Sequence, residues 1–171
     1  QLASRCKTII AVGRRGEQLQ ALRTELEKQT RVYPVVADLA TVEGVTRTVE
    51  ALRQQGPVDL LINNAGFSTL GDFADSSLEV ELQMVRLQVD APLELVRAAL
   101  PFMREQGGGA IINVASVGAY LELQKTAVYG GCKAFLLAFS RSLQAEVAAH
   151  GIRVQCLCPG LTRTEIHDTP H

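Results

Sequence analysis

The chain has 171 residues, enough for one domain with a sizeable buried core. Apolar residues make up 47%, and 17 Lys and Arg nearly balance 18 Asp and Glu, for a net charge of -1. This balance gives no support to a nucleic-acid or membrane-surface partner. No apolar run approaches the roughly 20 residues that span a bilayer. The segment Gln1–Lys7 leads into a strand-like run without a signal-peptide pattern.

Short apolar runs alternate with helical patterns along the chain. The pattern predicts strands at Thr8–Val12, Val32–Ala37, Val58–Ile62, Ala110–Ala115 and Ile152–Leu157. It predicts helices between them, at Glu17–Gln29, Val42–Gln55, Ser77–Gln106 and Thr126–His150. Continuously apolar strands are typical of a parallel sheet that helices cover on both faces. The sequence therefore predicts a single domain over residues 1–171, with a doubly wound parallel α/β sheet of the Rossmann type.

Ligands of such sheets bind at the carboxyl ends of the strands, near the topological switch point. The segments that fall there are Gly13–Arg15, Asp38–Leu39, Asn63–Gly66, Ser116 and Pro159–Thr164. A glycine permits the close approach of a ligand, although Asn63–Gly66 taken alone also fits an ordinary turn. We expect the functional site among these segments.

Four cysteines occur in the chain, and two of them, Cys156 and Cys158, point the same way if their segment is a strand. The chain offers no second Cys or His pair with zinc spacing, so we expect no metal site. Free cysteines are usually buried, and we interpret all four as buried, reduced thiols rather than metal ligands or a disulfide. A cytoplasmic location fits this interpretation.

Tyr129 and Lys133 lie four residues apart at the start of a predicted helix, so their side chains share a face. A nearby ammonium and the helix N-terminus both favour the phenolate, which lowers the pKa of a tyrosine towards the range of acid–base catalysis. Ser116, after the fourth strand, could hold the same substrate oxygen. Each feature alone also fits an ordinary surface pair or a helix N-cap.

The features together resemble the short-chain dehydrogenase/reductase family. Four motifs occur in the order and at the spacing that this family uses. They are Asn63-Asn64-Ala65-Gly66, Ser116, Tyr129 with Lys133, and Pro159-Gly160 with Thr164. The resemblance runs from Thr8 to about Glu165 and is strongest to bacterial single-domain oxidoreductases. It implies hydride transfer between the nicotinamide C4 of a cofactor and a carbonyl or alcohol carbon.

The resemblance also implies roles for individual residues. Tyr129 would be the acid–base residue, Ser116 would position the substrate oxygen, and Lys133 would lower the pKa of Tyr129 and bind the nicotinamide ribose. Asn63, Ala65 and Gly66 would line the adenosine side of the cofactor. Asp38 and Leu39 would hold the adenine, and the loop with Pro159, Gly160 and Thr164 would contact the pyrophosphate or carboxamide.

The end of the first strand bears on the choice of cofactor. An acidic residue there suits a free ribose 2′-hydroxyl, whereas an arginine suits a 2′-phosphate. The segment reads Val12-Gly13-Arg14-Arg15, without an acid, and guanidinium groups match phosphate geometry. The sequence therefore favours NADPH over NADH, with a solvated arginine pair as the alternative.

Gln88 stands where the family usually has a catalytic asparagine. Pro92 lacks the N–H that would bond the Gln88 carbonyl in a regular helix. We therefore hypothesise that this carbonyl binds a water leading towards Lys133. A Gln88→Asn variant with a far higher kcat would contradict the hypothesis, since the side chain would then be limiting.

A second departure concerns the Gly-rich turn that holds the pyrophosphate in the family. No such turn occurs in this sequence, and Gln1–Lys7 resembles the end of the helix that follows it. The absent strand would lie between the strands Thr8–Val12 and Val58–Ile62, so we expect an interrupted sheet. We expect the chain to be incomplete at both ends, and unstable or inactive alone. Reversible, cooperative unfolding as a monomer would contradict this expectation.

The leading prediction is an NADPH-dependent carbonyl reductase, or alcohol dehydrogenase in reverse, acting on a small molecule. One alternative is a non-catalytic regulator of the same fold that binds a nicotinamide nucleotide. Another is a nucleotide-sugar epimerase or dehydratase. The helices Ser77–Gln106 and Thr126–His150 match those that form dimer or tetramer interfaces in the family, so we expect a homodimer or homotetramer, unless both faces are buried within the monomer.

Overall fold

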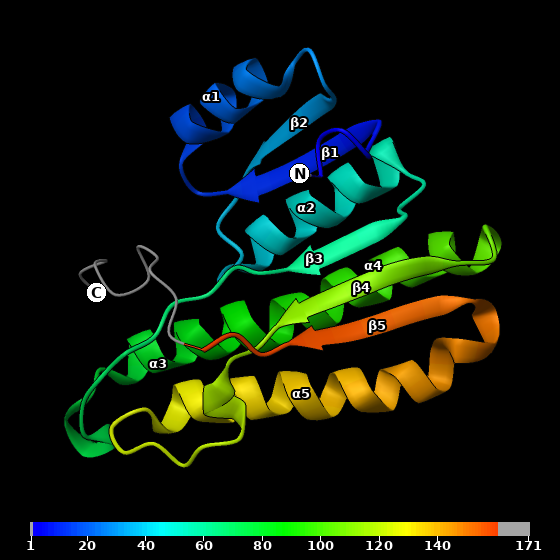
Figure 1. The fold of residues 1–171 in the computed structure, drawn as a ribbon. Helices are drawn as coiled ribbons and strands as arrows, with labels where there is room; N and C mark the ends of the chain where they lie inside the picture. Colours follow the sequence, from blue (N-terminus) through cyan, green and yellow to red (C-terminus); the bar gives the residue numbers. More distant parts are fainter. Residues whose placement is uncertain (1, 161–171) are drawn as a thin grey trace. The chain divides into compact units, whose positions relative to one another are not determined.

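A computed structural model describes residues 2–160 of the chain (Figure 1). The chain falls into two compact units, Gln1–Pro57 and Val58–His171. In chain order the elements are β1 (Thr8–Gly13), α1 (Gly16–Leu26), β2 (Arg31–Val36), α2 (Val42–Gln55), β3 (Leu60–Asn63), η1 (Phe73–Asp75), α3 (Leu78–Val85), η2 (Arg86–Asp90), α4 (Ala91–Glu105), β4 (Gly109–Val114), η3 (Val117–Ala119), α5 (Ala127–Val147), η4 (Ala148–His150) and β5 (Ile152–Leu157).

The first unit is a parallel pair of strands with two helices. β1 pairs with β2 in a register that runs from Thr8 opposite Arg31 to Gly13 opposite Val36. Both α1 and α2 contact these strands. The core consists of Val35, Ala37 and Ala51, with Ile10, Val12 and Tyr33 packed against it. Because the strands run parallel, the segments after β1 and β2 emerge at the same edge.

The second unit is a three-stranded parallel sheet in the order β3-β4-β5, with helices against one face. α4 contacts β3 and β4, while α5 contacts β4 and β5. Because α5 also contacts α3 and η2, these helices cover the same face of the sheet. On the other face, Ile62 and Leu157 are 40% and 47% exposed. The expectation that both faces of every strand are covered is therefore not met at these two positions, because the helices of this unit all lie on the opposite face.

The strands form two separate hydrogen-bonded sheets, one in each unit. The sequence predicts an interrupted sheet, with the strand at Thr8 separated from the strand after Pro57. In the structure, β1 pairs with β2 in one sheet and β3 pairs with β4 in the other. The parallel α/β architecture that the alternation predicts is confirmed in each sheet.

The helical stretch before β4 is not one regular helix. α3 passes into the π-helical turn η2, where the Ala91 N–H donates to the Arg86 carbonyl five residues back, and α4 follows. Pro92 stands directly after this turn and lacks an N–H, so the regular ladder of hydrogen bonds is interrupted here. The prediction of one helix over Ser77–Gln106 is therefore wrong in detail. None of the helices in the described part of the chain is long and apolar enough to span a bilayer.

Candidate active site

Ser116 and Tyr129 border the same glycine. Ser116 follows β4 and caps η3, where its Oγ accepts a hydrogen bond of 3.1 Å from the Gly118 N–H. A Cβ atom placed on Gly118 would lie 3.5 Å from the Ser116 Oγ and 3.6 Å from the Tyr129 Cε1. Both side chains are half-buried. Gly118 therefore adjoins both the serine hydroxyl and the tyrosine ring.

Lys133 is buried one turn further along α5. Its Nζ lies 5.4 Å from the centroid of the Tyr129 ring and donates a 3.1 Å hydrogen bond to the Val114 carbonyl. Burial lowers the pKa of the Lys133 ammonium to about 8. A cation at this distance from the face of an aromatic ring is attracted to it.

A chain of buried side-chain hydrogen bonds holds the end of β3. Asn63 lies opposite Asn113 in the parallel register, and its Nδ2 donates to the Asn113 Oδ1 at 2.8 Å. The Asn113 Nδ2 donates to the Ser140 Oγ at 2.9 Å, and this hydroxyl donates to the Leu136 carbonyl at 2.6 Å. The Asn63 side chain is therefore directed to Asn113, so the strand end is positioned by a partner on β4.

Sequence reasoning missed Asn113 and Ser140. The one available signal was an asparagine inside the apolar run Ala110–Ala115, because a buried amide requires a hydrogen-bond partner. Gly118 was also missed, because its place in the site depends on the two side chains that border it in the folded chain, Ser116 and Tyr129.

Gln88 lies in the π turn and packs against the loop after β3. It is 1% exposed, and its Nε2 donates a 2.9 Å hydrogen bond to the Phe67 carbonyl. A Cβ atom on Gly66 would come within 2.7 Å of the Gln88 Oε1. Among the described residues this buried oxygen has no hydrogen-bond partner. The side chain thus ties the loop that holds Ala65 and Gly66 to the helix, while the hypothesis on the Gln88 carbonyl stays a prediction.

The loop after β5 lies beside the turn of Ser116. The Val117 N–H donates a 3.0 Å hydrogen bond to the Pro159 carbonyl. Pro159 therefore lies next to the turn that begins at Ser116, while its role in a cofactor loop stays a prediction. Thr164 lies outside the described residues.

The remaining candidates lie in the first unit. Arg14 and Arg15 are exposed and follow β1. Asp38 and Leu39 follow β2, where the Asp38 Oδ1 accepts a 2.9 Å hydrogen bond from the Ala40 N–H. Gly44, in the first turn of α2, packs so closely that a Cβ atom there would collide with the Asp38 carbonyl oxygen. The carboxyl ends of β1 and β2 thus carry the residues predicted for the adenosine half of a cofactor.

The cysteines are only partly as predicted. All four are free thiols, but only Cys132 is buried, and Cys6, Cys156 and Cys158 are half-exposed. The burial prediction is wrong for these three. For Cys156 the reason is a hollow between α5 and β5, which it lines. In the described part of the chain, no group of three or more His, Cys, Asp or Glu side chains is arranged to hold a metal ion.

Comparisons with solved structures agree with this fold. A short-chain dehydrogenase from Sphingobium yanoikuyae in complex with NADPH is 32% identical, with a TM-score of 0.91 over 96% of this chain and 65% of that one. L-sorbose reductase from Gluconobacter frateurii, complexed with NADPH and L-sorbose, is 38% identical, with a TM-score of 0.86 over 93% of this chain and 62% of that one.

Sequence comparisons give the same result. An oxidoreductase of Staphylococcus epidermidis is 30% identical over 96% of this chain and 71% of its own length. The family model of short chain dehydrogenases matches residues 1–170. The chain therefore belongs to the short-chain dehydrogenase/reductase family of oxidoreductases, which act on alcohol and carbonyl groups.

Proposed function

We propose that the protein is an NADPH-dependent oxidoreductase that interconverts a carbonyl compound and an alcohol, with Tyr129 as the acid–base residue. The observation that carries this proposal is the arrangement of three side chains. Ser116 and Tyr129 both border Gly118, and the Lys133 Nζ lies 5.4 Å from the Tyr129 ring centroid.

In the reducing direction, Tyr129 would donate its proton to the carbonyl oxygen of the substrate. The Ser116 hydroxyl would hold the same oxygen, and the positive charge of Lys133 would stabilise the phenolate that remains. The cofactor, when bound, supplies the hydride. Oxidation of an alcohol would use the same groups in reverse.

The residues present fit a dinucleotide. Gly66 follows β3 without a side chain of its own, and a residue without a Cβ lets a ligand approach the backbone closely. In the second unit, we propose as cofactor-binding residues Asn63, Ala65, Gly66, Tyr129, Lys133, Pro159, Gly160 and Thr164. In the first unit, considered by itself, we propose the same role for Arg14, Arg15, Asp38 and Leu39. NADPH is bound by the proteins from Sphingobium yanoikuyae and Gluconobacter frateurii, which supports NADP over NAD here.

The cofactor preference is tested by replacing Arg14. A charged hydrogen bond to phosphate contributes about 1.5–3 kcal/mol, so Arg14→Ser should weaken NADPH binding roughly tenfold or more and leave NADH unchanged. Arg23→Ser, which removes an exposed arginine of α1, is the control. A fluorescence titration measures both cofactors. Equal losses for NADPH and NADH would contradict a contact with the 2′-phosphate.

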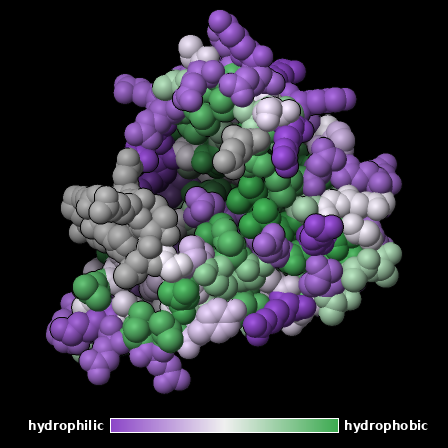
Figure 2. All heavy atoms as spheres, viewed as in Figure 1, coloured by the Kyte–Doolittle hydropathy of each residue, from purple (hydrophilic) through white to green (hydrophobic). Residues whose placement is uncertain are grey.

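Apolar side chains near the site favour a substrate with apolar substituents. Leu70 is 80% exposed and Phe73 is 60% exposed, while Leu121 and Leu123 are 51% and 52% exposed. The two loops that carry them are joined by a 3.0 Å hydrogen bond from the Gly71 N–H to the Lys125 carbonyl. Figure 2 shows apolar surface at this end of the second unit, at the lower left of the view.

The catalytic proposal is tested with Tyr129→Phe. Loss of the acid–base hydroxyl should lower kcat by about a hundredfold or more, with cofactor binding retained. Benzophenone and L-sorbose serve as an apolar and a polar ketone probe, and NADPH consumption is measured. Tyr33→Phe, in β2, is the matched control and should keep its activity. Undiminished turnover in Tyr129→Phe would overturn the assigned role.

The same assay separates the alternatives. Tight NADPH binding without turnover of either ketone would favour a non-catalytic regulator. Assembly into a homodimer or homotetramer stays a prediction, supported by exposed apolar residues on the helices before β4, with Leu78 at 64% and Leu82 at 45%. The cytoplasmic location is likewise a prediction.

A further inference from the structure

Two thiols face each other where β5 ends. The Sγ atoms of Cys156 and Cys158 are 3.9 Å apart, because residues two positions apart in an extended strand project from the same side. The Cys158 thiol also lies 4.0 Å from the Tyr120 hydroxyl. Both cysteines are half-exposed. Neither thiol takes part in the proposed hydride transfer.

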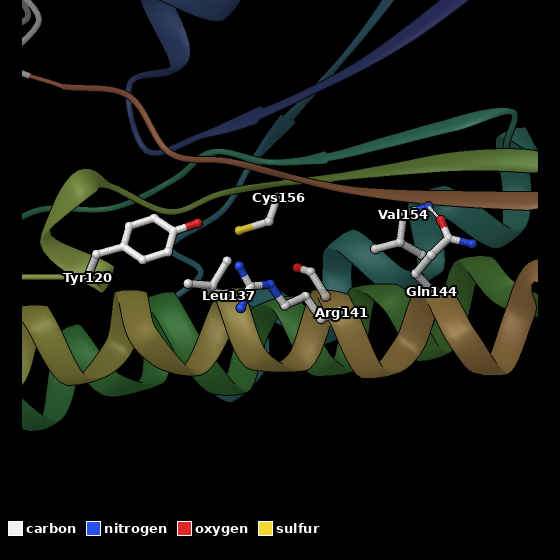
Figure 3. Close-up of a pocket in the computed structure, with 7 residues that line it drawn as sticks. Tyr120, Leu137, Arg141, Gln144, Val154 and Cys156 are labelled. Carbon is white, nitrogen blue, oxygen red and sulfur yellow. Dashed lines mark hydrogen bonds between the residues drawn. The ribbon is translucent and has the colours of Figure 1, made fainter.

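A hollow beside β5 reaches Cys156, one of the two cysteines. It has a volume of about 350 Å³ and is lined by Tyr120, Leu137, Ser140, Arg141, Gln144, Val154 and Cys156. Figure 3 shows the Tyr120 hydroxyl, the Cys156 thiol and the Arg141 guanidinium pointing towards one another in this hollow. A small oxidant fits such a volume.

We propose that Cys156 and Cys158 are a modification site, at which a hydroperoxide such as hydrogen peroxide converts the two thiols to an intramolecular disulfide. The thiolate of one cysteine attacks the O–O bond and forms a sulfenic acid, and the hydroxide that is released takes up a proton and leaves as water. The sulfur of the other cysteine then attacks the oxidised sulfur and displaces hydroxide, which leaves as a second water with the proton of that second thiol. Two thiols are oxidised, and one peroxide is reduced to two waters.

The backbone geometry allows the bond with a small adjustment. A disulfide needs the sulfurs about 2 Å apart and Cα atoms no more than about 6.8 Å apart. Residues two apart in a strand are separated by about 6.6 Å, close to this upper bound. Most disulfides have Cα atoms about 5.5–6 Å apart, so oxidation would rotate the side chains and slightly shorten the strand at Leu157.

This shortening would be transmitted to Ser116, a consequence that rests on the proposed function. The Leu157 carbonyl accepts a 2.8 Å hydrogen bond from the Ala115 N–H, and the Pro159 carbonyl accepts one of 3.0 Å from the Val117 N–H. These two bonds hold the backbone on either side of Ser116. A change in the strand between Cys156 and Cys158 acts on both, so the disulfide should lower turnover.

The modification is tested without an activity assay. The protein is treated with hydrogen peroxide and digested with trypsin without reduction. The mass of the peptide of residues 154–163, which contains both cysteines, is then measured by mass spectrometry. We expect it to lose the mass of two hydrogen atoms and to recover that mass with dithiothreitol. Cys158→Ser should abolish this loss, whereas Cys6→Ser should retain it. Recovery of the peptide only as unmodified dithiol, or only as sulfinic acid, would overturn the proposal.

The proposed effect of the disulfide on turnover is tested separately, with the ketone probe that the protein reduces. Peroxide should lower the NADPH consumption of the parent protein severalfold, reversibly with dithiothreitol, and should leave Cys158→Ser unaffected. A disulfide that forms without this change would remove the coupling to Ser116 and leave the modification site intact. A protein that turns over neither ketone fails as an oxidoreductase, while the peptide mass still decides the modification.

Discussion

Lys133 is held in a position where its charge is unfavourable for folding. Its side chain is 4% exposed, and burial lowers its pKa from 10.5 to about 8. A shift of this size corresponds to about 3 kcal/mol of lost stability while the group is charged. One hydrogen bond to the Val114 carbonyl offsets part of that loss. A buried cation retained at such a cost is typical of a functional position.

Lys133→Met should therefore stabilise the protein at pH 7, by about 2 kcal/mol once the lost hydrogen bond is subtracted. Between about pH 8 and 10.5 the unfolded chain binds more protons than the folded one, so the stability of the parent protein rises across this interval. The variant should lack this rise, so the two should converge at high pH.

Urea unfolding at several pH values measures both quantities. Lys28→Met, at an exposed lysine, is the control and should follow the parent protein. A methionine variant that is less stable than the parent at pH 7 would show that the burial of Lys133 carries no net penalty.

Two glycines show how one residue type acts differently in different elements. Gly44 lies at the start of α2, where a Cβ atom would collide with the Asp38 carbonyl oxygen. Gly131 lies on the exposed side of α5, with no atom within 4 Å of a Cβ placed on it. At Gly44, close packing determines how an added side chain changes stability. At Gly131, the conformational entropy of the backbone determines it.

Opposite effects on stability are thus expected from the same substitution. Gly44→Ala should lower the free energy of unfolding by about 2 kcal/mol or more, because the turn at Asp38 must move. Gly131→Ala should raise it by up to about 1 kcal/mol, because alanine is the better helix former. Denaturant midpoints measure both, and a loss of stability in Gly131→Ala would indicate a contact of that helix face.

The two sheets of the molecule differ in the number of strands that stabilise them. β4 is paired on both sides in a three-stranded sheet, whereas β1 and β2 form a sheet of two strands in the smaller unit. A small unit buries a smaller fraction of its surface, and two-stranded pairing is marginal without packed helices. The expectation that the chain alone is unstable or inactive stays a prediction.

Hydrogen exchange should reveal this difference. We expect the amides of β4 to exchange slowest and those of β1 and β2 to exchange considerably faster, since local stability follows burial and pairing. Exchange followed by mass spectrometry, corrected with the rates of the unfolded chain in urea, gives the comparison. Equal protection in β2 and β4 would mean that the two units open together.

Local patterns were enough to predict the elements and part of the site. The strand Ile152–Leu157 and the helix Val42–Gln55 agree with the structure residue for residue. Periodicity of apolar residues is a property of neighbouring positions, so the sequence alone determines it. The same holds for the spacing of Tyr129 and Lys133, which any helix brings onto one face.

Tertiary structure decided what depends on distant residues. The strand predicted at Val58–Ile62 lies at Leu60–Asn63 instead, because its pairing with β4 runs from Leu60 opposite Ala110 to Asn63 opposite Asn113, fifty positions away. The bond from the Gln88 amide to the Phe67 carbonyl and the π turn beneath it likewise depend on packing between elements. The sequence by itself determined which elements form and which residues stand at their ends. Only the folded chain decided what those side chains touch, because partners remote in sequence meet only after the sheet has assembled.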